Sequence, residues 1–251
     1  MITTINKFRR IFEKGVTFDD QTNTYNFDFN QDHPDDVMHL EPMQKRTKIM
    51  EHDGIKYHYY YCYHFEDGRH PGFLRAVKYI DNISEDDAFQ LVDQACVDID
   101  SKYELNEYST ILYPQSSSKI LSLFANQLKE QSHIETMLPN SFVKNSVDQI
   151  QLDEEAVSKL PEATQKQVRR VFANIRNLTT EFKLKDVFTR FRKFIKNFIK
   201  LEHDITSHVT GKKVILMDDY HTTGATMKEM MNILFALKPT EIFVVILIKV
   251  K

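Results

Sequence analysis

The sequence predicts an α/β protein in which a parallel, twisted sheet is flanked by helices. Apolar runs at 110–113 and 214–217 each lead through a loop of small and polar residues into a helical pattern. A third apolar run, 242–250, follows the second of these helices after a Lys-Pro turn. Strands that alternate with helices pair in parallel through right-handed crossovers. Ligands of such sheets bind at the carboxyl ends of the strands, so both loops are candidate binding segments.

The composition is that of a soluble globular protein. Of the 251 residues, 41% are hydrophobic and 27% are charged, which argues against extensive disorder, and the net charge of -3 does not by itself predict a nucleic-acid partner. Cys62 and Cys96 are too few for a disulfide framework, so a reduced, cytoplasmic setting is expected. The longest apolar run, 242–248, is far shorter than the ~20 residues of a membrane helix. Residues 1–15 lack an apolar stretch of signal-peptide length, and we expect no transmembrane segment.

The domain organisation is expected to have two parts. Residues 1–52 are polar and predict an N-terminal extension, with one short helix candidate at 8–12. Between residues 15 and 41 the chain has seven acidic residues and no Lys or Arg. The main domain is expected to span 53–251 and to carry a helix-rich insertion at about 145–205.

The main domain begins with a predicted strand at 57–65. Its period of two places Phe65 and four tyrosines on one face, and His58, Cys62 and His64 on the other. This His-Cys-His set has an alternative interpretation as a metal site. Structural metal sites usually have four ligands, however, and a strand surface with polar tips explains the same residues.

The other expected elements follow from apolar periodicity and from turn or capping residues. Further strands are expected at 73–80, 110–113, 141–145, 214–217 and 242–250, and helices at 84–99, at 120–130, within 153–205 and at 227–237.

The segment VILMDDYHTTGATM, residues 214–227, places two carboxylates at the end of a strand and a small hydroxyl-rich loop before a helix. Such a loop presents free backbone N–H groups and the positive end of the helix dipole, which suits a phosphate. Asp218 and Asp219 would repel a phosphate, and their natural partners are the vicinal hydroxyls of a sugar or a divalent cation. The segment therefore calls for a ligand with both a phosphate and a diol, and a ribose 5-phosphate fits.

These residues resemble the phosphoribosyl-pyrophosphate (PRPP) signature of the type I phosphoribosyltransferases, most closely that of ComF-like and orphan members. The resemblance implies that Asp218 and Asp219 are the catalytic carboxylates, which hold the ribose 2- and 3-hydroxyls and contact Mg²⁺ indirectly. The loop implied to bind the 5-phosphate consists of His221, Thr222, Thr223, Gly224, Ala225 and Thr226. The alternative, an ordinary strand–turn–helix with a capping threonine, does not require two aspartates before the turn.

The earlier loop, in LYPQSSSKILSLFA (residues 112–125), resembles the pyrophosphate-binding loop of the same family. The resemblance implies that Gln115, Ser116, Ser117 and Ser118 donate hydrogen bonds to the leaving pyrophosphate, and that Lys119 supplies a cation. A serine that caps the following helix explains this loop about as well. The resemblance is specific over 108–131 and 211–250 and vague elsewhere.

Departures from the family pattern concern the acceptor. Thr222 stands where family members acting on hypoxanthine and guanine carry an acidic residue that contacts the base, so that substrate class is not expected. Tyr220 is a candidate for stacking on the base, with a buried aromatic at the strand end as the alternative. The hood that chooses the base is not identified and could come from the strand at 57–65, from the middle segment, or from both.

Residues 183–200, KLKDVFTRFRKFIKNFIK, predict a basic amphipathic helix. Three interpretations are open for this helix. It could pack on the core with a solvated exterior, close over PRPP as a mobile cover, or contact a nucleic acid, a protein or a membrane surface.

Two functions are therefore compatible with the sequence. The first is a phosphoribosyltransferase-like protein that binds Mg-PRPP, or a ribose 5-phosphate nucleotide, and transfers or cleaves at the anomeric carbon. The second is a PRPP-sensing or effector subunit of a protein and nucleic-acid complex, as in retron-type bacterial defence systems. An oligomeric assembly is expected in either case.

Overall fold

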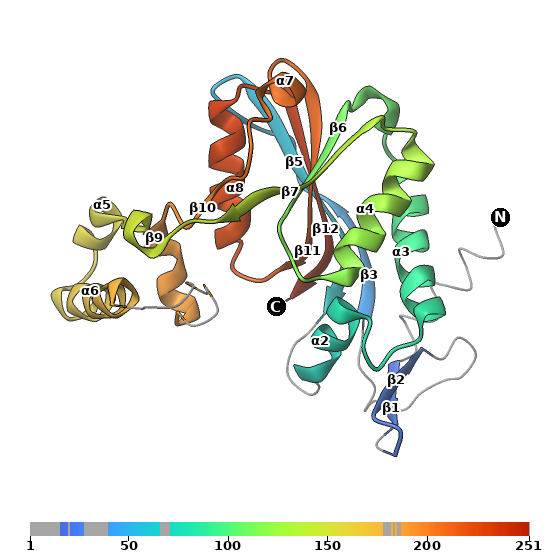
Figure 1. Ribbon diagram of the computed structural model, residues 1–251, viewed down its shortest axis with the longest axis horizontal. Helices are drawn as coiled ribbons and strands as arrows, with labels where there is room; N and C mark the ends of the chain where they lie inside the picture. The colour runs from blue at the N-terminus through green and yellow to red at the C-terminus, as the bar shows by residue number, and fades with distance from the viewer. Residues whose placement is uncertain are drawn as a thin grey trace.

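Figure 1 shows a computed structural model of the chain. The structure describes residues 16–19, 21–27, 40–65, 71–177, 182, 184 and 187–250. The helix expected at 8–12 and most of the acidic stretch at 15–41 lie outside this part of the chain.

A mixed sheet forms the centre of the molecule, and its strand order is β10-β7-β6-β11-β12-β5-β3, with β4 also paired to β5. The strands are β3 (Leu40–Arg46), β4 (Met50–His52), β5 (Ile55–Phe65), β6 (Thr110–Pro114), β7 (Thr136–Lys144), β10 (Ile199–Leu201), β11 (Lys213–His221) and β12 (Glu241–Val250). The five strands from β7 to β5 pair in parallel, whereas β10, β3 and β4 are antiparallel to their neighbours. The predicted α/β class with a mostly parallel sheet is confirmed.

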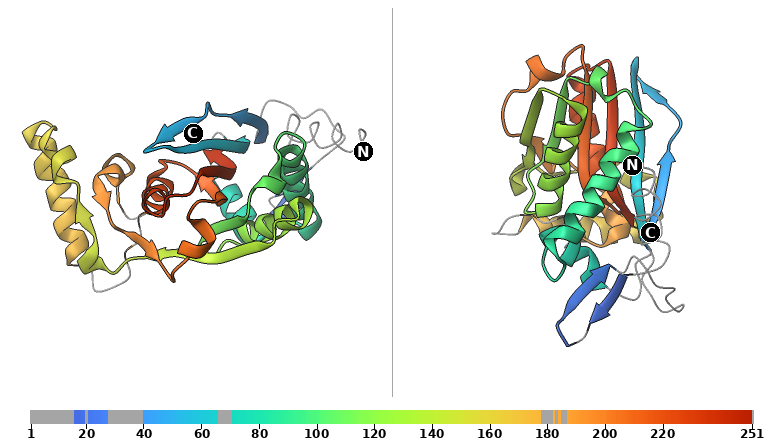
Figure 2. Two further views of the ribbon diagram at one scale, coloured as in Figure 1. Left: turned by 90° about the horizontal axis from the view of Figure 1, so that it is seen from above. Right: turned by 90° about the vertical axis from the view of Figure 1, so that its right-hand side faces the viewer.

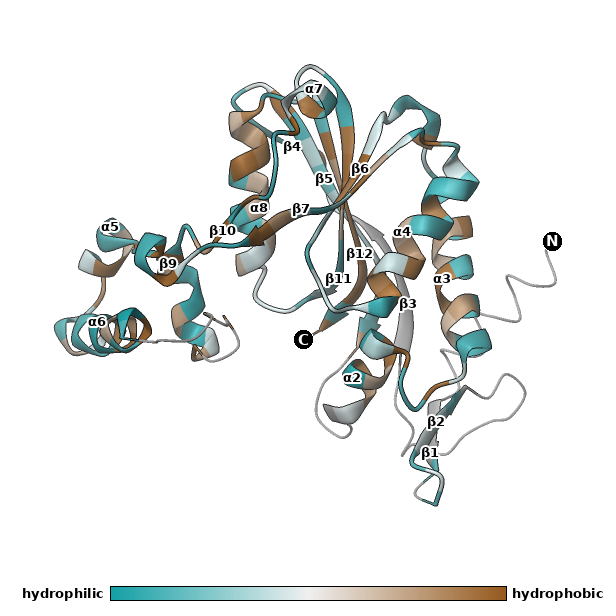
Figure 3. Cartoon of the chain, viewed as in Figure 1, coloured by the Kyte–Doolittle hydropathy of each residue, from teal (hydrophilic) through white to brown (hydrophobic). Residues whose placement is uncertain are grey.

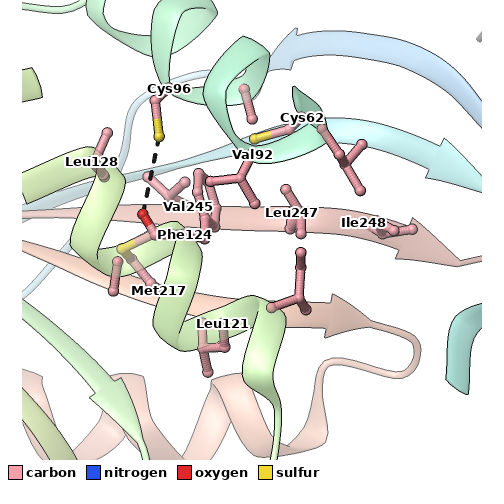
Figure 4. Close-up of a cluster of buried hydrophobic side chains, with 14 of the residues drawn as sticks. Cys62, Val92, Cys96, Leu121, Phe124, Leu128, Met217, Val245, Leu247 and Ile248 are labelled. Carbon is pink, nitrogen blue, oxygen red and sulfur yellow. Dashed lines mark hydrogen bonds between the residues drawn. The ribbon is translucent and has the colours of Figure 1, made fainter. Parts of the chain in front are cut away.

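Helices cover both faces of the sheet (Figures 1 and 2). One face packs on α2 (Pro71–Tyr79), α3 (Glu85–Asp100) and α4 (Lys119–Ser132), and the other on α7 (Thr206–Val209) and α8 (Ala225–Ala236). Hydrophobic residues gather where these helices meet the sheet (Figure 3). In the core beneath α3 and α4, Cys62 and Cys96 lie among Val92, Phe124 and Leu247 (Figure 4). Both cysteines are free thiols, and burial raises the pKa of each well above its usual value.

A separate lobe is inserted between β7 and β10, at the end of the molecule opposite α3 and α4 (Figure 2). Its elements are η2 (Val147–Gln149), β8 (Gln151–Leu152), α5 (Glu154–Ser158), α6 (Glu162–Arg176), η4 (Thr189–Phe194) and β9 (Ile195–Lys196). The lobe has an apolar core of its own, in which Val157 and Val168 pack with Phe191 and Phe194. Ala225, at the start of α8, packs against this lobe core.

The predicted extension at 1–52 contributes strands both outside and inside the central sheet. The described part of the extension contains β1 (Val16–Asp19) and β2 (Thr24–Phe27), which form a hairpin. The strands β3 and β4 pair with β5 and so complete the central sheet.

Two element predictions are wrong. Residues 73–80 were expected to form a strand, but 71–79 form α2, because Phe73, Ala76 and Val77 bury one helical face. The continuous helix expected at 183–200 is also absent from the described residues. The helical residues described there are Leu184 and those of η4, all in 3-10 conformation. Asn197 has φ of 57°, and the chain turns into β10, which pairs with β7. Among the described residues of 153–205, the α-helices are α5 and α6.

The strand predicted at 57–65 forms within β5, but its two faces are not those expected from strict alternation. Tyr63 and Phe65 lie on the α3 side, where the Tyr63 hydroxyl donates to the Leu91 carbonyl at 2.9 Å. Tyr57, Tyr59 and Tyr61 pack toward α8, and Tyr60 and Cys62 toward α3. The metal alternative has no support within the described residues, which contain no group of three or more His, Cys, Asp or Glu able to hold an ion. No helix in the described ranges is both long and apolar enough to cross a membrane.

Candidate functional site

The carboxylate pair lies at the carboxyl end of β11, between the neighbouring strands β6 and β12. Asp219 is 5% exposed. The Asp219 N–H donates to Asp218 Oδ1 at 3.0 Å, and the Tyr220 N–H donates to Asp219 Oδ1 at 2.8 Å. These local bonds fix both side chains at the point where the strand gives way to the loop.

One cavity of about 350 Å³ joins the two loops that the sequence singled out. It is lined by the β11–α8 segment from Asp218 to Met227 and, on the β6 side, by Pro114, Gln115 and Ser116. Further lining residues come from β7, α2, the lobe and β10: Phe142, Lys144, Lys78, Phe182, Leu184, Arg192, Phe198 and Ile199. Because β6 and β11 are adjacent and parallel, the loops that follow them meet at one edge of the sheet.

The carboxylate pair is electrostatically asymmetric. Lys78 Nζ lies 3.3 Å from Asp219 Oδ2 and forms an ion pair with it. Burial raises the pKa of Asp218 well above its usual value, and the neighbouring charge of Asp219 adds to the effect. Asp219 is therefore the member of the pair that has a direct cationic partner.

The first turn of α8 has no side-chain cap among the described residues. Gly224 is the N-cap residue with φ of 70°. The capping threonine of the alternative interpretation is therefore not found. Helices α3 and α4, by contrast, are capped by Ser84 and Ser118. The first-turn N–H groups of α8 are therefore available to a ligand such as a phosphate.

His221 and Tyr220 both contact residues outside the loop. The His221 ring stacks near Tyr59 and Tyr61, with centroids 6.1 and 5.5 Å away, and its Nδ1 is buried with no hydrogen-bond partner among the described residues. Burial, and then the charge of Lys249, lower the His221 pKa. The Tyr220 hydroxyl donates to the Leu74 carbonyl at 2.8 Å. Tyr220 thus packs as a strand-end aromatic against α2 while also lining the cavity.

The residues of the β6–α4 loop have different surroundings. Gln115 and Ser116 line the cavity. The Ser118 hydroxyl accepts from Leu121 N at 3.3 Å and is therefore the helix cap that the alternative interpretation described. The Ser117 hydroxyl lies 3.5 Å from the Tyr79 hydroxyl. Lys119 is exposed and lines a different hollow, together with Ile80, Glu85, Asp86, Phe89 and Leu123.

Several lining residues were not singled out by the sequence as site residues, namely Lys78, Phe142, Lys144, Phe182, Arg192 and Phe198. Lys78 lies in a segment that was expected to be a strand. The spacing of Phe73, Ala76 and Val77 is the signal that identifies this segment as a helix. Lys144 and the lobe residues have no local motif, because tertiary packing brings them to the cavity.

Comparisons with known proteins give a partial likeness in fold. No family model matches the chain, and no curated protein matches it. A hypoxanthine phosphoribosyltransferase structure from Staphylococcus aureus overlaps with a TM-score of 0.36 and 11% identity, covering 66% of this chain and 65% of its own. The chain thus spans just under two thirds of that structure. An alanine mutant from a study of an invariant aspartic acid in HPRTs overlaps with a TM-score of 0.36 and 12% identity, covering 66% of this chain and 69% of its own.

Proposed function

We propose that the chain is a type I phosphoribosyltransferase-like protein that binds Mg-PRPP, or a nucleotide with a ribose 5-phosphate, in this cavity. The observation that carries the proposal is one cavity that contains both the uncapped start of α8 and the Asp218–Asp219 pair. The first suits a phosphate and the second a vicinal diol, and few residues separate them.

The ligand is assigned to the cavity in three parts. The 5-phosphate binds the backbone N–H groups and hydroxyls of 222–226, and the ribose hydroxyls bind Asp218 and Asp219. The pyrophosphate lies toward Gln115 and Ser116, which line the same cavity from the neighbouring strand.

The proposed chemistry is displacement of pyrophosphate from the anomeric carbon by a nitrogen nucleophile or by water. The carbon–oxygen bond to pyrophosphate breaks, its electron pair leaves with the pyrophosphate, and the nucleophile forms the new bond and then loses its proton to solvent or to the pyrophosphate. The chain contributes by holding the ribose in place and by stabilising charge as the bond breaks.

The donor set near the acidic pair fits a magnesium ion that is held partly by the ligand. Two adjacent carboxylates are hard oxygen donors, but the described residues offer no third acidic or imidazole group for a cage made of protein alone. Asp218 and Asp219 would therefore hold a hydrated Mg²⁺ together with oxygens of the substrate. When bound, the ion would neutralise charge on the pyrophosphate.

The acceptor is expected to lie against the lobe. Phe182 and Phe198 pack edge to face with ring centroids 6.3 Å apart, and both line the cavity with Arg192. Aromatic walls favour a flat acceptor ring. PRPP sensing without catalysis would use the same pocket, so ligand binding is the first property to test.

The test is calorimetric titration of PRPP with Mg²⁺ into the wild type and into Asp218→Asn/Asp219→Asn. The wild type is expected to bind, and the double variant to lose at least about a hundredfold in affinity, because two charge-assisted contacts are removed. Asp100→Asn, an exposed carboxylate on α3, is the matched control and is expected to bind normally. Absence of binding by the wild type would refute the proposal. If binding is found, pyrophosphate release with a panel of nitrogen acceptors tests catalysis.

A further inference from the structure

Helix α2 is connected by hydrogen bonds to both candidate ligand loops. The Ser118 hydroxyl donates to the Lys78 carbonyl at 3.4 Å, and the Ser117 hydroxyl lies 3.5 Å from the Tyr79 hydroxyl. On the other side, the Tyr220 hydroxyl donates to the Leu74 carbonyl. In Figure 1, α2 lies beyond the carboxyl ends of the central strands. The helix therefore bridges the loop after β6 and the end of β11.

The last turn of α2 places one ammonium group in the cavity. Lys78 Nζ is 3.3 Å from Asp219 Oδ2, and the Lys78 side chain is 29% exposed. It lines the cavity together with Gln115 and Ser116. Lys119, the cation expected from the sequence, instead lines the hollow that contains Glu85 and Asp86. Of these two lysines near the serine loop, the structure places Lys78 at the carboxylates.

Packing at the other end of α2 fixes where Lys78 lies. Phe73 and Val77 are fully buried on one helical face. A Cβ at Gly72 would lie only 2.6 Å from the Tyr25 hydroxyl, so the first turn is tightly packed against β2. A helix held at both ends keeps the side chain of its last turn in a defined position.

We infer that Lys78 is the cation that binds the pyrophosphate group of the ligand, a role that rests on the proposed function. Without ligand, the ammonium pairs with Asp219. When the ribose diol binds the carboxylates, the same ammonium lies between them and Gln115, next to the place assigned to the pyrophosphate. A fixed positive charge at that place stabilises the negative charge that grows on the departing group.

The test compares three ligands, each with Mg²⁺, by calorimetry: PRPP, inorganic pyrophosphate and ribose 5-phosphate. The central variant is Lys78→Met, which removes the charge and keeps most of the side-chain volume. Lys78→Arg keeps a cation. Lys119→Met tests the lysine that the sequence suggested for this role. Lys212→Met is the control and removes an exposed lysine next to the amino end of β11, at the opposite end of the strand from the cavity.

Lys78→Met is expected to weaken PRPP and pyrophosphate at least about tenfold and ribose 5-phosphate less than about threefold. Lys78→Arg should restore most of the loss, and Lys119→Met and Lys212→Met should bind like the wild type. An equal loss of affinity for all three ligands would show that Lys78 only positions Asp219, and it would overturn the inference. A loss in Lys119→Met with none in Lys78→Met would overturn it as well.

The same titrations separate this inference from the proposed function. If the wild type binds pyrophosphate but not PRPP, the proposed function fails, and the pyrophosphate arm alone then decides the role of Lys78. If the wild type binds PRPP but Lys78→Met binds it equally well, the inference about Lys78 fails while the proposed function stands. If the wild type binds neither ligand, both are refuted.

Discussion

At the scale of single residues, the loop after β11 requires glycine at position 224. Its φ of 70° lies in the left-handed region, which is costly for residues with a Cβ. A Cβ at this position would also collide with His221 Nε2. The loop conformation that leaves the first turn of α8 uncapped thus depends on glycine for two separate reasons.

Gly224→Ala is therefore expected to lower the free energy of unfolding by more than backbone strain alone. Gly211 is the matched control, since its φ is 69° and nothing lies within 4 Å of an added Cβ. We expect Gly211→Ala to cost about 1 kcal/mol. Gly224→Ala should cost roughly 1 kcal/mol more, because the His221 ring must move.

Urea unfolding of both variants, alone and combined with His221→Ala, checks this prediction. The excess cost of Gly224→Ala should disappear when His221 is truncated, because the collision is then absent. An excess that persists in the double variant would show that the ring is not its cause.

Residues of the site differ in how far they could be predicted. Asp218, Asp219 and the hydroxyl loop form one contiguous segment, and local chemistry alone pointed to a phosphate and a diol. Lys78 and Arg192 reach the cavity from distant segments. Their contribution depends on tertiary packing that no local pattern contains.

At the scale of elements, α8 is connected to the inserted lobe by a hydrogen bond between the backbone and a side chain. The Asn197 N–H donates to Glu229 Oε2 at 2.8 Å, and Glu229 is 8% exposed. Burial raises the Glu229 pKa above its ordinary value of 4.5, while this hydrogen bond and the nearby Lys228 and Lys196 oppose the shift. The acceptor of this hydrogen bond is thus a buried carboxylate, and burial makes its charged form unfavourable.

The sign of the pH dependence follows from the direction of this shift. A group whose pKa is raised in the folded state stabilises that state fully below its unfolded pKa of about 4.5 and loses this contribution as pH rises through the folded pKa. Glu229→Gln keeps an oxygen acceptor without the charge. It is therefore expected to raise the melting temperature at pH 7 relative to wild type, with a difference that shrinks toward pH 4.5.

Glu229→Ala provides the contrast, because it removes the acceptor as well as the charge. We expect the alanine variant to be about 1 kcal/mol less stable than the glutamine variant at pH 7. Melting curves from pH 4.5 to pH 8 measure both effects. Equal stability of the two variants would show that the bond to Asn197 contributes nothing.

Elements with a clear apolar run or stripe were predicted well. Elements whose local pattern disagrees with their tertiary pairing were not. The segments around β6, α4, β11, α8 and β12 have clear apolar runs or stripes, and all five form as expected. The segment 187–199 has a helical apolar stripe. Phe191, Phe194 and Phe198 are buried in the lobe core, whereas Phe188 is exposed. Pairing of β10 with β7 overrides the local helical preference there.

At the scale of the whole molecule, the cavity is lined by two bodies: the sheet body, which has a hydrophobic core on each face, and the lobe. The sheet and its helices form the larger body, and the lobe packs around its own buried residues. The sequence predicted a parallel sheet flanked by helices but not the order of its strands, which depends on long-range pairing. It left open whether the middle segment covers the ligand, and the structure shows that the lobe supplies one wall of the cavity.

Because the walls of the cavity come from the sheet body and from the lobe, a bound ligand should stabilise both of them. Hydrogen exchange with Mg-PRPP is expected to slow at 222–226 and 115–116 and also in the lobe segment 191–199. Amides of α3, which does not line the cavity, serve as the internal control, and Asp218→Asn/Asp219→Asn should show no change with ligand. Protection confined to the two loops would mean that the lobe does not contact the ligand. Protection that includes 191–199 would show that the bound ligand stabilises the wall of the cavity to which Arg192 and Phe198 belong.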